Sequence, residues 1–274
     1  ARVEGTASSY AGININGGVN PESGGSTLDG KSYGILSLGG VLYMWVSPGS
    51  NDENWNRVDL LKSADRGATW STAIPSFVTE SDGVGIPAIL QFGRDYAGAR
   101  DDFVYSYFIN IRDATSLAVQ KPGAIALVRA PRGDVEDRSA YEWFAGVDES
   151  GNAVWSPGIT NREPVFEDAN GVGWNLSVVH NAGLDRYILV TEHTESMAGN
   201  IGIFDAPEPW GPWSAVTYQE NWPQGGQVEH SSFFWNFSPK WWSDGGLGFV
   251  LIFSGVDEND SWNTVRGSFV LPNT

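Results

Sequence analysis

The chain has 274 residues, with 34 Gly, 14 Pro and 13 Trp but only 16 Lys and Arg together. This composition leaves too few strong helix formers for a helical bundle, and the 41 % content of hydrophobic residues excludes a disordered chain. The formal net charge of −17 repels polyanions, so neither nucleic acid nor an anionic membrane is expected as a partner.

Cysteine is absent, which excludes disulfides, a thiol nucleophile and Cys-ligated metal sites. No apolar run approaches the ~20 residues that a membrane-spanning helix needs. The chain begins at Ala1 without an initiator Met or a signal peptide, which predicts a processed or truncated product. Together with few Lys, many Trp, an acidic charge and sequons at Asn175, Asn236 and Asn259, this predicts a secreted protein.

Short strand-like runs, separated by clusters of Gly, Pro, Asn and Asp, recur along the chain in four groups. The first three groups contain four runs each, and the fourth stops one run short. In chain order the predicted strands are 33–38, 41–46, 58–62 and 70–74; 88–92, 103–109, 124–128 and 141–144; 174–179, 187–191, 201–204 and 213–218; 233–238, 248–253 and 264–271.

Four-stranded units repeated in this way are typical of a β-propeller, in which sheets pack face to face around a channel. The missing outer strand of the fourth unit leaves two interpretations of residues 2–15. They supply that strand and close the ring, or they are the tail of a blade whose inner strands are absent from this chain. Both interpretations predict one all-β domain over residues 1–274.

The turn after the third strand of the first unit, residues 63–70, matches the Asp-box pattern of sialidase-type propellers. In this pattern Asp65 bonds backbone N–H groups of the turn, Gly67 takes an unusual dihedral angle, and Trp70 packs between sheets. The equivalent place in the third unit holds a different turn, 205–213, which also ends in Trp. We expect both turns to serve folding rather than catalysis.

Several runs together resemble a family of secreted microbial proteins labelled as a domain of unknown function. The runs are 40–46, 63–70, 91–105, 137–146, 205–213, 240–241 and 253–255. Members look like five-bladed propellers, and some are endo-D-arabinanases. The resemblance implies a five-bladed β-propeller of four-stranded antiparallel blades, with the first blade incomplete here, because members usually carry a further Trp- and Asp-rich stretch upstream. Members need not share a substrate, so arabinan is one example.

The resemblance also implies that substrate binds at the face carrying the starts of the inner strands and the loops between second and third strands. Glycoside hydrolysis needs one protonated and one ionised carboxyl group. Of the acids on this face, Glu192, Glu229 and Asp29 are the catalytic candidates. Glu192 ends an apolar strand that would raise its pKa. Glu229 opens the inner strand of the fourth unit, and Asp29 leads into that of the first.

Aromatic and polar residues on the same face are candidates for sugar binding, by stacking and by hydrogen bonds to hydroxyl groups. Packing between blades is an equally good explanation for two of the tryptophans, Trp174 and Trp235. The candidates are Trp55, Asn56, Arg112, Trp174, Asn175, His193, His230 and Trp235.

The three histidines lack metal-ligand spacing, so no metal site and no cofactor is predicted, although the acidic loop 257–260 leaves a structural Ca²⁺ open. The predicted function is a secreted, monomeric glycoside hydrolase that cleaves a neutral polysaccharide or oligosaccharide with paired carboxylates. A polysaccharide lyase using Arg112, His193, His230 and Tyr33 is one alternative, which the acidic charge disfavours because lyases neutralise a uronate. A non-catalytic glycan-binding propeller is the other.

Overall fold

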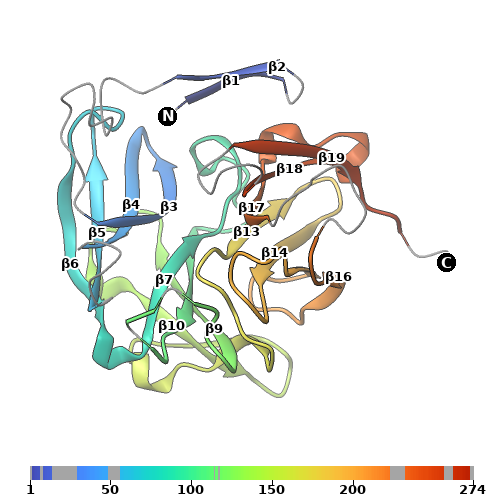
Figure 1. The fold of residues 1–274 in the computed structure, drawn as a ribbon. Coiled ribbons are helices and arrows are strands. Elements are labelled where there is room, and N and C mark those ends of the chain that lie inside the picture. Colours follow the sequence, from blue (N-terminus) through green and yellow to red (C-terminus); the bar gives the residue numbers. More distant parts are fainter. Residues whose placement is uncertain are drawn as a thin grey trace.

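The computed structural model describes residues 2–6, 9–13, 30–48, 56–113, 115–116, 118–222, 232–255 and 262–271. Almost all regular structure in these segments is antiparallel β-sheet, and the helical elements are single 3₁₀ turns. No described helix is long and apolar enough to cross a membrane. Four sheets are arranged around a common centre, with strands β3, β7, β13 and β17 innermost (Figure 1).

The first sheet contains β3 (Lys31–Leu38), β4 (Val41–Ser47), β5 (Arg57–Ser63) and β6 (Ser71–Thr79). The third contains β13 (Ser177–Asn181), β14 (Arg186–Glu192), β15 (Ile201–Ala206) and β16 (Ser214–Gln219). The fourth has the three described strands β17 (Phe233–Phe237), β18 (Gly248–Ser254) and β19 (Asn263–Ser268). In all three sheets the strands follow one another in chain order, as in the blades of a propeller.

The second sheet is larger than the predicted four-stranded unit. It runs through β7 (Val84–Ile89), β8 (Phe103–Asn110), β9 (Gly123–Pro131), β10 (Glu142–Val147) and β11 (Ala153–Ser156), and β12 (Pro164–Asp168) also pairs with β9. Strand β12 pairs with residues 123–126 of β9, and β10 pairs with residues 128–129. Two strands therefore share the outer edge of β9.

The prediction of five blades is not supported by the structure. In the described segments four sheets of three or more strands surround the centre, and β1 (Arg2–Thr6) pairs only with β2 (Ser9–Ile13) in a separate hairpin. Figure 1 draws this hairpin between the first and fourth sheets. The interpretation that residues 2–15 form the outer strand of the fourth sheet is also not observed, because neither strand pairs with β19 in the described ladders.

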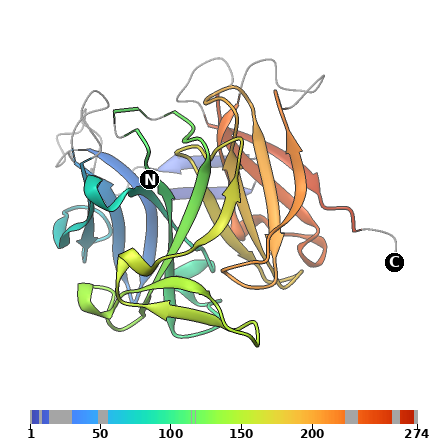
Figure 2. The same ribbon diagram turned by 90° about the horizontal axis from the view of Figure 1, so that it is seen from below.

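Alternation of side chains along each strand divides the interior into two hydrophobic clusters. One joins the first and second sheets to one face of the third, with Tyr187 and Leu189 of β14 as members. The other joins the opposite face of the third sheet, with Ile188 and Val190 of the same strand, to the fourth sheet. Figure 2 shows the third and fourth sheets, in orange and red, packed against each other.

The turn at residues 63–70 has the predicted hydrogen bonds of Asp65 and the predicted dihedral angle of Gly67, and Trp70 is not a member of either hydrophobic cluster. Asp65 accepts hydrogen bonds from the backbone and the hydroxyl of Thr69 at 2.9 and 2.6 Å and from the Ser63 hydroxyl at 2.7 Å. The Thr69 hydroxyl is the largest cause that lowers the pKa of Asp65 to about 2. Gly67 has a φ of 87°, which favours glycine. The turn joins β5 to β6 through local bonds.

Candidate functional site

A central cavity of about 390 Å³ lies where the four inner strands converge. Its lining is polar and aromatic, and it contains no carboxylate among the described residues. The polar side chains are contributed by every sheet: Ser32, Tyr33, Gln91, Asn175, Ser177 and Asn236. Neutral hydrogen-bonding groups around aromatic surface are suited to a polyhydroxylated ligand without charge.

Trp174 and Asn175 both line this cavity, immediately before β13. The Trp174 ring packs edge-to-face on Phe234 at 4.6 Å, and the Lys31 ammonium lies 5.6 Å from its centroid. Asn175 is only 6 % exposed, and its amide oxygen and nitrogen have no hydrogen-bond partner within the described part of the chain. A buried amide usually has partners, so Asn175 offers both a donor and an acceptor to a ligand.

Glu192, at the end of β14, is fully buried next to Gly173, which directly precedes Trp174 and Asn175 in the chain. Its backbone carbonyl accepts a hydrogen bond from the Gly173 N–H at 2.8 Å, and its Oε1 accepts one from the Met197 N–H at 2.6 Å. Oε2 is buried without a partner in the described residues. It lies so close to Gly173 that a Cβ there would be 2.5 Å away, which explains the glycine.

Burial raises the pKa of Glu192 to about 7, and the Met197 N–H opposes this shift. The carboxyl group therefore retains its proton close to neutral pH, as a general acid must. It does not itself line the central cavity, although it contacts Gly173, which directly precedes the lining residues Trp174 and Asn175. The sequence prediction that Glu192 is held at the rim of the site differs from the structure, in which Glu192 is fully buried and is not part of the cavity lining.

This carboxyl group predicts how stability depends on pH. The ordinary pKa of a glutamate is 4.5, so between about pH 4.5 and 7 the folded state keeps a proton that the unfolded state loses. Stability from this group is therefore complete below about pH 4.5 and decreases as the pH rises to about 7, by on the order of 3 kcal/mol. Replacing Glu192 by Gln removes this dependence.

We expect the unfolding free energy of Glu192→Gln, relative to wild type, to be higher at pH 8 than at pH 4.5. Urea titrations of both proteins at the two pH values measure this difference. The comparison cancels the contributions of all other acids. A difference that is equal at both pH values would show that folding does not raise the pKa of Glu192.

His193 lies on the opposite side of β14 from Glu192, because successive side chains of a strand alternate. It is fully buried, its Nδ1 is 2.9 Å from the Thr194 hydroxyl, and its ring stacks on Tyr218 at 3.7 Å with an interplanar angle of 9°. Burial lowers the pKa of His193. The structure thus places His193 beneath Tyr218 and away from the central cavity.

The other predicted binding residues are dispersed. Trp235 is fully buried between the third and fourth sheets, and its Nε1 donates to the Ser232 hydroxyl at 3.1 Å, so its predicted sugar-binding face is closed to a ligand. Arg112 is exposed, with its Nε bonded to the Pro122 carbonyl at 2.9 Å. Asn56 is exposed directly before β5. Neither Arg112 nor Asn56 lines the cavity.

Four predicted site residues, Asp29, Trp55, Glu229 and His230, lie outside the described residues. Conversely, the structure adds Gln91, Ser177 and Asn236 to the cavity lining, which the sequence analysis did not select. The only signal for Ser177 and Asn236 was a polar residue within or next to an apolar inner strand. Many surface positions carry that signal, so it does not identify a site.

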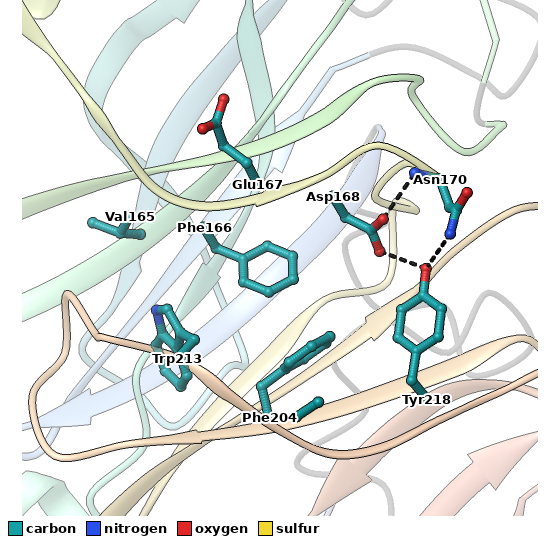
Figure 3. A pocket seen from close by; sticks show the side chains of 9 residues that line it. Val165, Phe166, Glu167, Asp168, Asn170, Phe204, Trp213 and Tyr218 are labelled. Atoms are coloured by element: carbon teal, nitrogen blue, oxygen red, sulfur yellow. Dashed lines mark hydrogen bonds between the residues drawn. The ribbon is translucent and has the colours of Figure 1, made fainter.

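A second pocket, of about 480 Å³, lies between β12 and β16 on the outer side of the molecule (Figure 3). At one end the Tyr218 hydroxyl donates to Asp168 Oδ2 at 2.7 Å and accepts from Asn170 Nδ2 at 3.0 Å. Phe166 and Phe204 meet edge-to-face in its centre at 4.7 Å. The sequence analysis selected none of these residues for a site.

The fold and the central cavity define an all-β propeller. The chain belongs to the family described as "domain of unknown function (DUF4185)", whose family model matches residues 32–273. No curated protein matches the chain.

Solved structures with a similar fold include a thermostable family-43 glycoside hydrolase, at 14 % identity, 89 % coverage of this chain, 73 % of the other and a TM-score of 0.51. A family 117 glycoside hydrolase from Zobellia galactanivorans is 15 % identical, and the match covers 86 % of this chain and 68 % of the other, with a TM-score of 0.43. An endo-arabinanase from Bacillus licheniformis is 12 % identical, and the match covers 89 % of this chain and 94 % of the other, with a TM-score of 0.39. At 14 % identity, the similarity to the family-43 structure, which alone of these three has a TM-score above 0.5, is one of fold.

Proposed function

We propose that this protein is a glycoside hydrolase that cleaves a neutral polysaccharide or oligosaccharide at the central cavity. The observation that carries the proposal is the pairing of two features at one edge of the cavity. Asn175, whose amide has no partner among the described residues, lines the cavity together with Trp174, and the Glu192 carboxyl group, which contacts the preceding Gly173, retains its proton near neutral pH. Sugar binding and proton donation would then occur at adjacent positions.

In this mechanism Glu192 gives its proton to the glycosidic oxygen as the bond to the leaving sugar breaks. A second, ionised carboxylate attacks the anomeric carbon or deprotonates the attacking water. We assign this second role to Asp29 or Glu229, because these acids precede β3 and β17, two of the strands that line the cavity. Access of the sugar to Glu192 requires the segment around Gly173 to move, since the carboxyl is buried in this structure.

The charge of the protein supports a neutral substrate. The formal net charge is −17, and the described lining of the cavity contains no Lys or Arg, although the Lys31 ammonium lies 5.6 Å from the centroid of the Trp174 ring. Burial also raises the pKa of Tyr33, so this phenol ionises less readily than an ordinary tyrosine to the phenolate that a lyase would use as its base. Both observations favour hydrolysis over the lyase alternative. The resemblance to endo-D-arabinanases makes arabinan the first substrate to test.

We also retain a monomeric, secreted protein as part of the proposal, on compositional grounds, and no cofactor for the reaction. Within the described segments no group of three His, Cys, Asp or Glu side chains could hold a metal ion. The acidic loop 257–260, where a structural Ca²⁺ was left open, lies outside them.

Product analysis tests the proposed function. We expect the protein to release new reducing ends from at least one of D-arabinan, L-arabinan, galactan and xylan, without the ultraviolet absorbance of an unsaturated uronate. A reducing-end assay and absorbance, recorded on the same reaction, measure both. Absorbing product from polygalacturonate would establish the lyase instead. Binding to a polysaccharide without turnover would establish the non-catalytic alternative.

A further inference from the structure

We propose that the pocket between β12 and β16 is a second binding site for a neutral sugar chain, distinct from the central cavity. We call this pocket the seam groove, and its lining includes Phe166, Asp168, Asn170, Phe204, Trp213 and Tyr218. The proposed function supplies only the class of ligand. The site itself rests on the shape, the aromatic surface and the charge of the groove.

The groove follows the length of β16. Trp213 lies directly before this strand and Tyr218 near its end, with Phe166 and Phe204 between them (Figure 3). Five residues of extended strand span roughly 17 Å, so the aromatic side chains form an extended floor rather than a single contact. Tyr218 is 39 % exposed, which leaves part of its ring open to a ligand. Such a floor matches the flat apolar faces of linked sugar rings.

Polar groups at both ends suit hydroxyl groups. Asp168 is half-buried, and its two carboxylate oxygens are held by the Asn170 N–H at 2.8 Å and by the Tyr218 hydroxyl at 2.7 Å. Each oxygen retains lone-pair capacity for a further donor. At the opposite end, the Trp213 Nε1 is buried without a hydrogen-bond partner among the described residues. Because this nitrogen is almost inaccessible in the structure, a sugar hydroxyl could accept from its N–H only after the Trp213 ring shifts.

The charge of the groove selects the ligand class. Its lining carries two carboxylates, Glu167 and Asp168, and no Lys, Arg or His. Uronates, sulfated sugars and phosphates would be repelled, while hydroxyl groups are donors that carboxylates accept well. Tyr218 also stacks on His193, the residue that follows Glu192. A sugar chain bound in the groove would therefore end next to β14, the strand that carries the proposed general acid Glu192.

Affinity gel electrophoresis in gels containing arabinan, galactan or xylan tests the groove. We expect wild type to be retarded by at least one of these polysaccharides, and Tyr218→Ala to bind about tenfold more weakly. Tyr218→Phe keeps the ring and should lower the affinity for the polysaccharide about threefold. Asp168→Asn keeps the shape and should also bind several-fold more weakly, which preserves the test if Tyr218→Ala fails to fold. Val216→Ala is the matched control, because Val216 is exposed on the same strand and does not line the groove.

The outcomes separate the groove from the proposed function. If all variants were retarded as strongly as wild type, the groove would not be a binding site. The same would follow if wild type were not retarded in any of the three gels. Stronger binding of trilysine than of any polysaccharide, lost in Asp168→Asn, would assign the groove to cationic peptides and overturn the proposal. Groove-dependent binding without hydrolysis would support the groove as a binding site and contradict the proposed hydrolase activity. Hydrolysis without groove-dependent binding would support the hydrolase activity and contradict the groove as a binding site.

Discussion

Replacing Glu192 by Gln should lower the rate of glycan hydrolysis about 10²- to 10⁴-fold, the range typical for the loss of a general acid. Glutamine has the shape of a protonated glutamic acid, and its amide oxygen can still accept the Met197 N–H that Glu192 Oε1 accepts at 2.6 Å. It has no proton to give to the leaving oxygen. The loss should therefore appear in kcat, measured as reducing ends released from the substrate that wild type cleaves, while the fold persists.

Glu195→Gln is the matched control for this experiment, because Glu195 is an exposed acid in the same loop. It should retain wild-type activity. Full activity in Glu192→Gln would show that Glu192 is a buried structural acid, and would remove it from the mechanism. In the same assay, Asp29→Asn or Glu229→Gln should show a comparable loss and so identify the ionised partner.

Truncating Trp235 to Ala should destabilise the protein by about 3–5 kcal/mol, as expected for a large aromatic side chain removed from a core. Trp235 is fully buried in the cluster that joins the third and fourth sheets, together with Val179, Ile188 and Phe253. The substitution leaves a cavity there and frees the Ser232 hydroxyl from the indole N–H. We expect the melting temperature to fall by about 10 °C for a chain of this size.

Calorimetry and urea unfolding measure this effect, with Trp262→Ala as the control. Trp262 is 47 % exposed, so its removal should change the unfolding free energy by less than about 1 kcal/mol. Trp235→Phe should fall between Trp235→Ala and wild type. If Trp235→Ala kept wild-type stability and lost only glycan binding, Trp235 would be a ligand contact after all, as the sequence analysis allowed.

Much of the fold follows from local sequence. Alternating apolar residues and glycine-rich turns located the strands near their observed bounds, for example 187–191 for β14 and 248–253 for β18. The turn around Asp65 was also predictable, because its hydrogen bonds join residues only a few positions apart. The division of the outer edge of β9 between β10 and β12 was not, since β12 pairs with residues about 40 positions earlier in the chain.

The site was only partly predictable for a related reason. The sequence indicated that Glu192 follows an apolar strand, and the pKa of about 7 has the cause expected there, namely burial. It could not show which interface each side chain enters. Alternation predicts that the side chains of Glu192 and His193, at the end of β14, point in opposite directions, but not that Glu192 contacts Gly173 and that His193 stacks on Tyr218.

The sequence by itself therefore determined the all-β class, the repeated strand units, the acidic charge that disfavours polyanions, and a short set of candidate acids. Only the tertiary structure decided that, in the described part of the chain, four sheets surround the centre, that Trp235 belongs to the core, and that Asn175 lines the cavity. The seam groove also forms only in the tertiary structure, because its lining residues Phe166 and Tyr218 come from β12 and β16. The physical reason is that strand periodicity is a local property, whereas cavities and grooves form between strands that are distant in sequence.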